Sequence, residues 1–436
     1  MLTTELWCIV IKKIAHRSAA KKLKKTPTNF RALCKTTAHI PVQINCKLIY
    51  FGCVPFSFNS TTIRHLEEMN LTIIHITHLS LDLREPYHIP QLPNSVTHLV
   101  IKNVTPTILR LPISLLYLEI NSVPQSLPVT LRYLKITTTI HNLSHSGHGE
   151  LPNLTHLILD CYDIIFNYTT PVLTYLEIKR HFKNCFKSFP PTLTHLIIDD
   201  WRTVFSVPLP AKLKHFRCLS SLGITSQLPD TLEYLYLINS QGVRFPASLK
   251  TLIIGLVEVE HDLSHLKSLK NLDITTESAE ICYPSNLKRL NLCHRRLVPA
   301  LLPSSLKYLR FHPYSYRTQL DINLTCLDSL KSFTLKCDDK CNIVLPESLE
   351  VLILTDTFIR NLPYLPKSLT TLGLSKLCLQ SLDAIPEGII KLYLGESHAR
   401  AFNMLPEMMK ELILERISAR CQHIKLYDYK TDTELK

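Results

Sequence analysis

Cysteine and histidine are the side chains of this chain best suited to chemistry, because they act as nucleophiles, acid–base groups or metal ligands. The sequence contains 14 cysteines and 20 histidines. Cys337 and Cys341 stand close together, but no second pair of cysteines or histidines has the spacing of a zinc site. Cys421 is followed by too short a stretch to form a domain that would lower the pKa of its thiol. We therefore expect no catalytic residue, no metal site and no cofactor.

The composition argues against nucleotide-dependent enzymes and favours an acidic partner. Only 9 of the 436 residues are glycine, and no G-x-G-x-x-G or G-x-x-x-x-G-K string occurs to bring backbone amides against a phosphate. The formal net charge is +13, which attracts acidic surfaces. The cysteines lack the regular spacing of a disulfide framework, and the apolar run 6–11 is too short to cross a membrane. These features predict reduced thiols in a cytoplasmic or nuclear protein that does not bind membranes.

An internal repeat occupies most of the chain and must position any binding residues. The segments LPNSVTHLVI (92–101), LPISLLYLEI (111–120) and LPESLEVLIL (345–354) share the pattern P-x-x-L-x-x-L-x-L. Its middle leucine recurs about every 20 residues from Leu99 to Leu412. Leucines two residues apart on a strand point to the same face, so each copy predicts a strand with one buried face. Units this short cannot enclose their leucines alone, so we expect them to stack into a solenoid.

The expected fold is an α/β repeat: a curved solenoid with a parallel β-sheet on its concave face and mostly extended or 3₁₀ segments on its convex side. The period and the LPxSLxxLxL wording resemble leucine-rich repeats, in particular the Pro-opened subclass that includes the FNIP-type repeats of amoebal and giant-virus proteins. The resemblance covers residues 76–415, about 17–18 repeats. The family's asparagine after the strand, which holds the turn, is replaced here, for example by Val104, Val123 and Trp201. The resemblance therefore does not predict how these turns are held.

The first 45 residues carry a second resemblance. The strings LTTELWCIVIKKI (2–14) and NFRALCKTTAHI (29–40) resemble the opening and closing segments of an F-box. An F-box followed by leucine-rich repeats is the arrangement of substrate receptors that dock on a Skp-type adaptor of a cullin ubiquitin ligase. A plain helical cap that shields the first repeat is the alternative. The resemblance implies adaptor contacts by Leu2, Glu5, Leu6, Ile9, Leu33 and Cys34.

These features divide the chain into four parts. They are an F-box-like helical module at 1–45, a connector and N-terminal cap at 46–75, the solenoid at 76–415 and a C-terminal cap or tail at 416–436.

Two columns of side chains are expected on the concave face, where repeat proteins usually bind. The residue before the middle leucine is His or Tyr in eight consecutive repeats, which predicts a row of rings with apolar faces and hydrogen-bonding tips. This row consists of His98, Tyr117, Tyr133, His156, Tyr175, His195, His215 and Tyr234. One position earlier, the second half predicts a basic strip suited to an acidic or phosphorylated peptide. With its neighbouring arginines, this strip comprises Lys214, Lys250, Lys270, Lys288, Arg289, Lys307, Arg310 and Lys331.

Both columns have an alternative explanation. Aromatic residues favour strands and stabilise one another across a sheet, and exposed lysines on a solenoid commonly serve solubility. With these alternatives open, we expect a non-catalytic interaction protein: a ligase substrate receptor that binds its target on the concave face, monomeric within its complex. A leucine-rich scaffold or decoy without a ligase is the second hypothesis, and nucleic acid is not the expected partner.

Overall fold

The computed structural model describes the repeats and leaves gaps between them. The described residues are 56–59, 78–82, 92, 94, 96–102, 111–121, 126–137, 148–160, 166–179, 188–199, 208–219, 227–240, 242–257, 262–276, 281–313, 320–336, 341–355, 363–374, 386, 388–394 and 425–428. The F-box-like segment 1–45, with Leu2, Glu5, Leu6, Ile9, Leu33 and Cys34, lies outside them.

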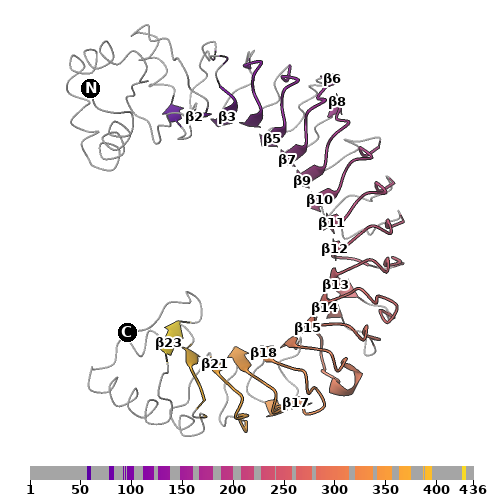
Figure 1. The fold of residues 1–436 in the computed structure, drawn as a ribbon, viewed down its shortest axis with the longest axis vertical. Coiled ribbons are helices and arrows are strands. Elements are labelled where there is room, and N and C mark those ends of the chain that lie inside the picture. Colours follow the sequence, from indigo (N-terminus) through magenta and orange to yellow (C-terminus); the bar gives the residue numbers. More distant parts are fainter. Residues whose placement is uncertain are drawn as a thin grey trace, which may run out of the picture. The chain divides into compact units, whose positions relative to one another are not determined.

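The chain divides into two compact units, residues 1–213 and residues 214–436. Within unit 1, parallel pairing joins its main strands in chain order. These strands are β1 (Phe56–Asn59), β2 (His78–Asp82), β3 (His98–Lys102), β4 (Tyr117–Ile120), β5 (Tyr133–Thr137), β7 (His156–Asp160), β9 (Tyr175–Lys179) and β10 (His195–Asp199). Figure 1 shows that within this unit the strands line one side and the connecting segments the other.

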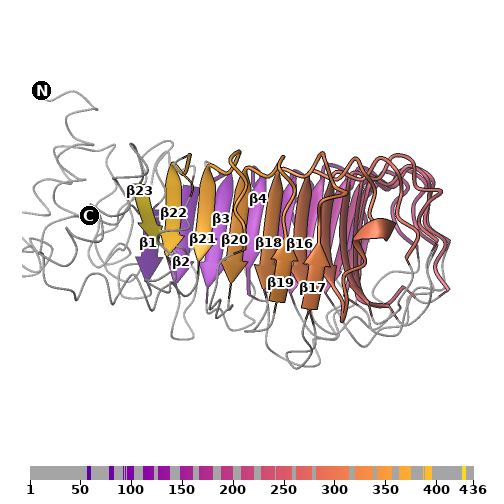
Figure 2. The same cartoon turned by 90° about the horizontal axis from the view of Figure 1, so that it is seen from below.

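Unit 2 repeats the same construction. Its main strands also pair in parallel and in chain order, and Figure 2 shows β18, β20, β21 and β22 side by side. The strands are β11 (His215–Cys218), β12 (Tyr234–Leu237), β13 (Thr251–Val257), β14 (Asn271–Thr276), β15 (Arg289–Cys293), β16 (Tyr308–His312), β18 (Ser332–Lys336), β20 (Val351–Thr355), β21 (Thr371–Leu374), β22 (Lys391–Leu394) and β23 (Lys425–Asp428). The predicted parallel-strand solenoid is confirmed in both units.

The core of each unit is the stacked column of middle leucines. Burial alternates along the strands, as in β5 and β20, so that one face is core and the other faces outward. From Leu99 to Leu392, none of the described middle leucines, or the phenylalanines that replace two of them, is more than 2% exposed. The strand register places these residues directly opposite one another, for example Leu99 opposite Leu118. The period of the leucines is therefore explained by one continuous apolar stack per unit.

In many repeats a proline opens a tight turn that leads into the strand. The amide of the leucine three residues later donates to the proline carbonyl, at 3.2 Å for Leu115 and Pro112 and 3.0 Å for Leu306 and Pro303. Proline has no N–H to contribute to the sheet, so a turn position is where it costs least.

The serine or threonine of the LPxS motif forms a row of hydroxyl groups, one per turn, here called the hydroxyl ladder. Its members donate to backbone carbonyls of the preceding repeat: Thr130 to Ile113 and Leu115 at 2.7 and 2.8 Å, and Ser305 to Ser285 and Leu287 at 2.6 and 2.7 Å. Thr192, Ser248, Ser348 and Ser368 make equivalent bonds. These bonds satisfy turn carbonyls and join one repeat to the next.

Shorter elements lie away from the main strands. β6 (His148–Glu150) pairs with β8 (Asn167–Thr169) in unit 1, and β17 (Leu320–Asn323) pairs with β19 (Cys341–Val344) in unit 2. Among the described residues the helical element is the 3₁₀ turn η1 (Pro299–Leu301), in keeping with the expected extended or 3₁₀ connections. β1 and β23 lie outside the range 76–415 and continue the parallel pairing at both ends.

The cysteines depart from the sequence prediction at one position. Cys218, Cys282, Cys293 and Cys326 are not in disulfide bonds. Cys341 is disulfide-bonded, so the prediction of reduced thiols throughout was wrong there. Its partner lies outside the described residues.

In the part of the chain that the structure describes, no helix has the length and apolar character to span a bilayer.

Candidate functional site

The candidate site is the outward face of the main strands, here called the sheet face. In unit 1, six of the predicted ring residues form one column on this face, because the register sets each directly opposite the next. Successive centroid distances, from His98 to His195, are 5.6, 4.2, 6.3, 5.5 and 6.1 Å. The closest pair, Tyr117 and Tyr133, stacks with only 8° between the ring planes. These six rings are called the aromatic column.

Neighbouring groups hold the histidine rings of the aromatic column in place. The Nδ1 atoms of His98, His156 and His195 each lie 2.9 Å from the hydroxyl of the preceding threonine. The hydroxyls of Thr155 and Thr194 already donate to carbonyls of the preceding repeat, at 3.0 and 3.1 Å. For these two pairs the Nδ1–H of the histidine is therefore the donor, which fixes the tautomer and the ring orientation.

Acidic side chains orient the tyrosines. The hydroxyl of Tyr117 donates to Glu119, and that of Tyr175 donates to Glu177 at 2.9 Å. Burial, followed by these carboxylates, raises the pKa of the Tyr117 and Tyr175 phenols above the ordinary value. Both phenols therefore stay protonated at physiological pH. Glu119 also forms an ion pair with Lys135 at 3.2 Å, so this carboxylate beside the rings already has two partners within the protein.

In unit 2 the row of rings is short. His215 and Tyr234 stack at 5.5 Å, and the register next aligns Tyr234 with Thr251 and then Asn271. Unit 2 also contains two cation–π contacts that the sequence did not predict. Arg217 lies 5.3 Å from the Tyr236 ring centre. Arg289 lies 4.4 Å from the Tyr308 ring centre.

The predicted basic strip forms a second column in unit 2. Backbone hydrogen bonds of 2.8–2.9 Å connect its members from turn to turn. In order along the column they are Lys214, Glu233, Lys250, Lys270, Lys288, Lys307, Lys331 and Glu350. The five consecutive lysines, Lys250 to Lys331, are here called the lysine column.

The lysine column is neutralised at its ends. Glu233 pairs with Lys250 and Glu350 pairs with Lys331, both at 2.7 Å. The hydrogen bond from Lys250 lowers the pKa of Glu233 below its ordinary value. In the described part of the chain, Lys270, Lys288 and Lys307 have no carboxylate partner within ion-pairing distance.

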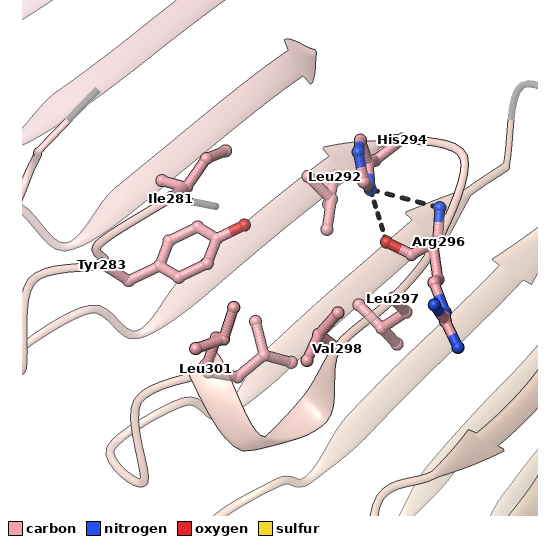
Figure 3. Close-up of a pocket in the computed structure, with 9 residues that line it drawn as sticks. Ile281, Tyr283, Leu292, His294, Arg296, Leu297, Val298 and Leu301 are labelled. Atoms are coloured by element: carbon pink, nitrogen blue, oxygen red, sulfur yellow. Dashed lines mark hydrogen bonds between the residues drawn. The ribbon is translucent and has the colours of Figure 1, made fainter. Parts of the chain in front are cut away.

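A small pocket lies beside η1, away from both columns. Figure 3 shows Tyr283, Leu292, His294 and Leu301 around it, with Nδ1 of His294 within hydrogen-bonding distance of the Arg296 amide, at 3.2 Å, and of the Arg296 carbonyl oxygen. Its volume of about 20 Å³ has room for about one water molecule. It is too small for a cofactor or substrate.

The described residues offer little for catalysis. They contain no group of three or more His, Cys, Asp or Glu side chains that could hold a metal ion. Cys293 lies 3.7 Å from Nδ1 of His312, an arrangement that could activate a thiol. Burial, however, raises the pKa of the Cys293 thiol, which favours the unreactive protonated form.

No model of a known protein family matches the sequence, and no curated protein matches it. Solved structures that resemble it include CroV588, described as a circular leucine-rich-repeat protein, with a TM-score of 0.48 and 21% identity over 75% of this chain and 54% of that one. This chain thus spans about half the length of CroV588. YopM from Yersinia enterocolitica has a TM-score of 0.43 and 23% identity over 73% of this chain and 72% of that one. The leucine-rich-repeat protein LIC12759 from Leptospira interrogans has a TM-score of 0.36 and 18% identity over 84% and 99%.

Proposed function

We propose that this chain is a non-catalytic interaction protein that holds another protein against the sheet face of its leucine-rich repeats. The observation that supports this most strongly is the aromatic column of unit 1. Its rings combine apolar faces with polar tips, which is the chemistry enriched at protein interfaces. The partly exposed rings Tyr117, Tyr133 and Tyr175 are stacked or hydrogen-bonded before any partner arrives. A partner would therefore meet a pre-ordered surface, which lowers the entropy lost on binding.

The more specific role we propose is that of a substrate receptor for a cullin ubiquitin ligase. This role is supported by the F-box-like sequence of residues 1–45 and by the repeats that follow it. In this role, Leu2, Glu5, Leu6, Ile9, Leu33 and Cys34 bind a Skp-type adaptor and the sheet face selects the substrate. The chain would then act in the cytoplasm or nucleus.

A test of the ligase role uses purified Skp adaptor and the full chain. The combined substitutions Leu6→Asp and Ile9→Asp should abolish co-purification of the adaptor, because they place charges at apolar anchors of the interface. Lys12→Asp with Lys13→Asp is the control, and it should leave adaptor binding unchanged. If the unmodified chain retains no adaptor, the ligase role is wrong and the second hypothesis, a scaffold or decoy without a ligase, replaces it.

A further inference from the structure

The lysine column of unit 2 is a cationic surface. Among the described residues, carboxylates pair with the lysines at its two ends and not with the three at its centre. Its two end lysines meet glutamates of the same column at 2.7 Å. Lys270, Lys288 and Lys307, one per turn between them, have no such partner among the described residues. Successive strands lie about 4.8 Å apart, so three like charges stand in a row at close spacing.

Two arginines beside the column add to this field. Arg289 follows Lys288 on β15 and stacks on Tyr308, and Arg310 is exposed on β16. The acidic residue on strands β14 to β16, Asp273 of β14, accepts a hydrogen bond from Asn291 at 2.8 Å. Of the charged residues on β14 to β16 and directly before them, only Asp273 is acidic, so positive charge prevails where these turns enter the strands.

The ion pairs at the two ends of the column show that its lysines pair with carboxylates. At both ends a glutamate from the adjacent turn lies along the column and forms a short ion pair with the lysine beside it. The central lysines occupy the same position in their repeats and are exposed or partly exposed, so their ammonium groups are accessible to carboxylates supplied from outside. We propose that the central lysines bind a segment of a partner protein rich in aspartate and glutamate.

The geometry favours this occupant over phosphate groups. Lysines in a row present one ammonium per turn along a line, whereas a single phosphate is held best by donors that converge, such as an arginine fork. Glu233 and Glu350 also bound the column at both ends, and they would repel a nucleic-acid strand that ran past them. A short acidic peptide fits between them. This inference deepens the proposed function but concerns a different surface from the aromatic column.

The direct test measures fluorescence anisotropy of a labelled peptide of alternating glutamate and serine, added to the full chain. The triple substitution Lys270→Gln, Lys288→Gln and Lys307→Gln should weaken binding about tenfold, because it removes three surface ion pairs that are each weak. Lys212→Gln, Lys267→Gln and Lys367→Gln, which remove the same charge from exposed sites outside the column, should weaken it less than about twofold. Equal losses in the two triple variants would overturn the proposal, as would failure of the unmodified chain to bind.

A reciprocal variant protects the test against a folding artefact. Glu233→Gln with Glu350→Gln frees Lys250 and Lys331 and should tighten peptide binding several-fold. Unchanged or weaker binding would contradict the proposal. Oligothymidylate and a singly phosphorylated serine peptide serve as competitors, and tighter binding of either one would replace the acidic segment as the occupant. If only the acidic peptide fails while a partner is still captured on the aromatic column, the inference is wrong and the proposed function stands.

Discussion

The hydroxyl of Ser305 shows how much a single small side chain does in this repeat. It donates to the carbonyls of Ser285 and Leu287, at 2.6 and 2.7 Å, and so fastens one turn to the turn before it. Its neighbour Ser304 has the same side chain, is exposed and makes no such bond among the described residues. Comparing the two serines therefore distinguishes the stability contributed by the ladder hydrogen bonds from the effect of replacing any exposed serine.

We expect Ser305→Ala to lower the free energy of unfolding by about 1–2 kcal/mol, because two turn carbonyls lose their donor. Ser304→Ala should change it by less than about 0.5 kcal/mol. Urea unfolding of the full chain, followed by circular dichroism, measures both. Equal effects of the two substitutions would show that the hydroxyl ladder does not stabilise the repeats.

The phenol of Tyr117 provides a prediction at alkaline pH. Burial and the Glu119 carboxylate raise its pKa above the ordinary value of 10.0, so folding favours the protonated phenol. The stability that this provides is complete below about pH 10 and is lost as the pH rises through the higher pKa of the folded state. Tyr117→Phe should therefore reduce the alkaline loss of stability, measured as the melting temperature at increasing pH. Tyr364→Phe, at a tyrosine that is 73% exposed, should not reduce it.

At the scale of the strand, the sequence predicted the element type and its buried face well. The two-residue spacing of the leucines can only bury both on one face of a strand, and the proline marks where that strand can begin. The sequence did not predict the hydroxyl ladder, because a serine in a turn is commonly just an exposed polar residue. The signal was present in the recurring serine or threonine of LPxS, always two residues after the proline. The disulfide at Cys341 was missed because sequence alone does not pair cysteines.

A matched pair on β7 tests the strand's two faces. Leu157 is fully buried, whereas its neighbour Ile158 is partly exposed on the sheet face. Leu157→Ala should lower the free energy of unfolding by about 2–5 kcal/mol, because it leaves a cavity in the leucine stack. Ile158→Ala should cost less than about 1 kcal/mol. Similar losses at both positions, measured by urea unfolding, would contradict the assignment of the core face.

At the scale of the molecule, the alignment of the repeats predicted that both sets of candidate residues lie on the outward face of the strands. What it could not supply was how each side chain is held. The threonine beside each of three histidines, the glutamates beside Tyr117 and Tyr175 and the ion pairs at the ends of the lysine column all depend on three-dimensional neighbours. Those partners distinguish an ordered binding surface from a row of exposed residues.

Binding of a partner protein to the sheet face can be tested directly. A photo-crosslinking amino acid placed at Tyr133, within the aromatic column, tests it in the full chain inside cells. Glu150, exposed on β6 in the same unit but outside the main sheet, is the matched position. We expect mass spectrometry to find a partner protein enriched at position 133 over position 150, and Tyr117→Ala to reduce its capture. Equal recovery from both positions, or recovery from position 150 alone, would contradict it.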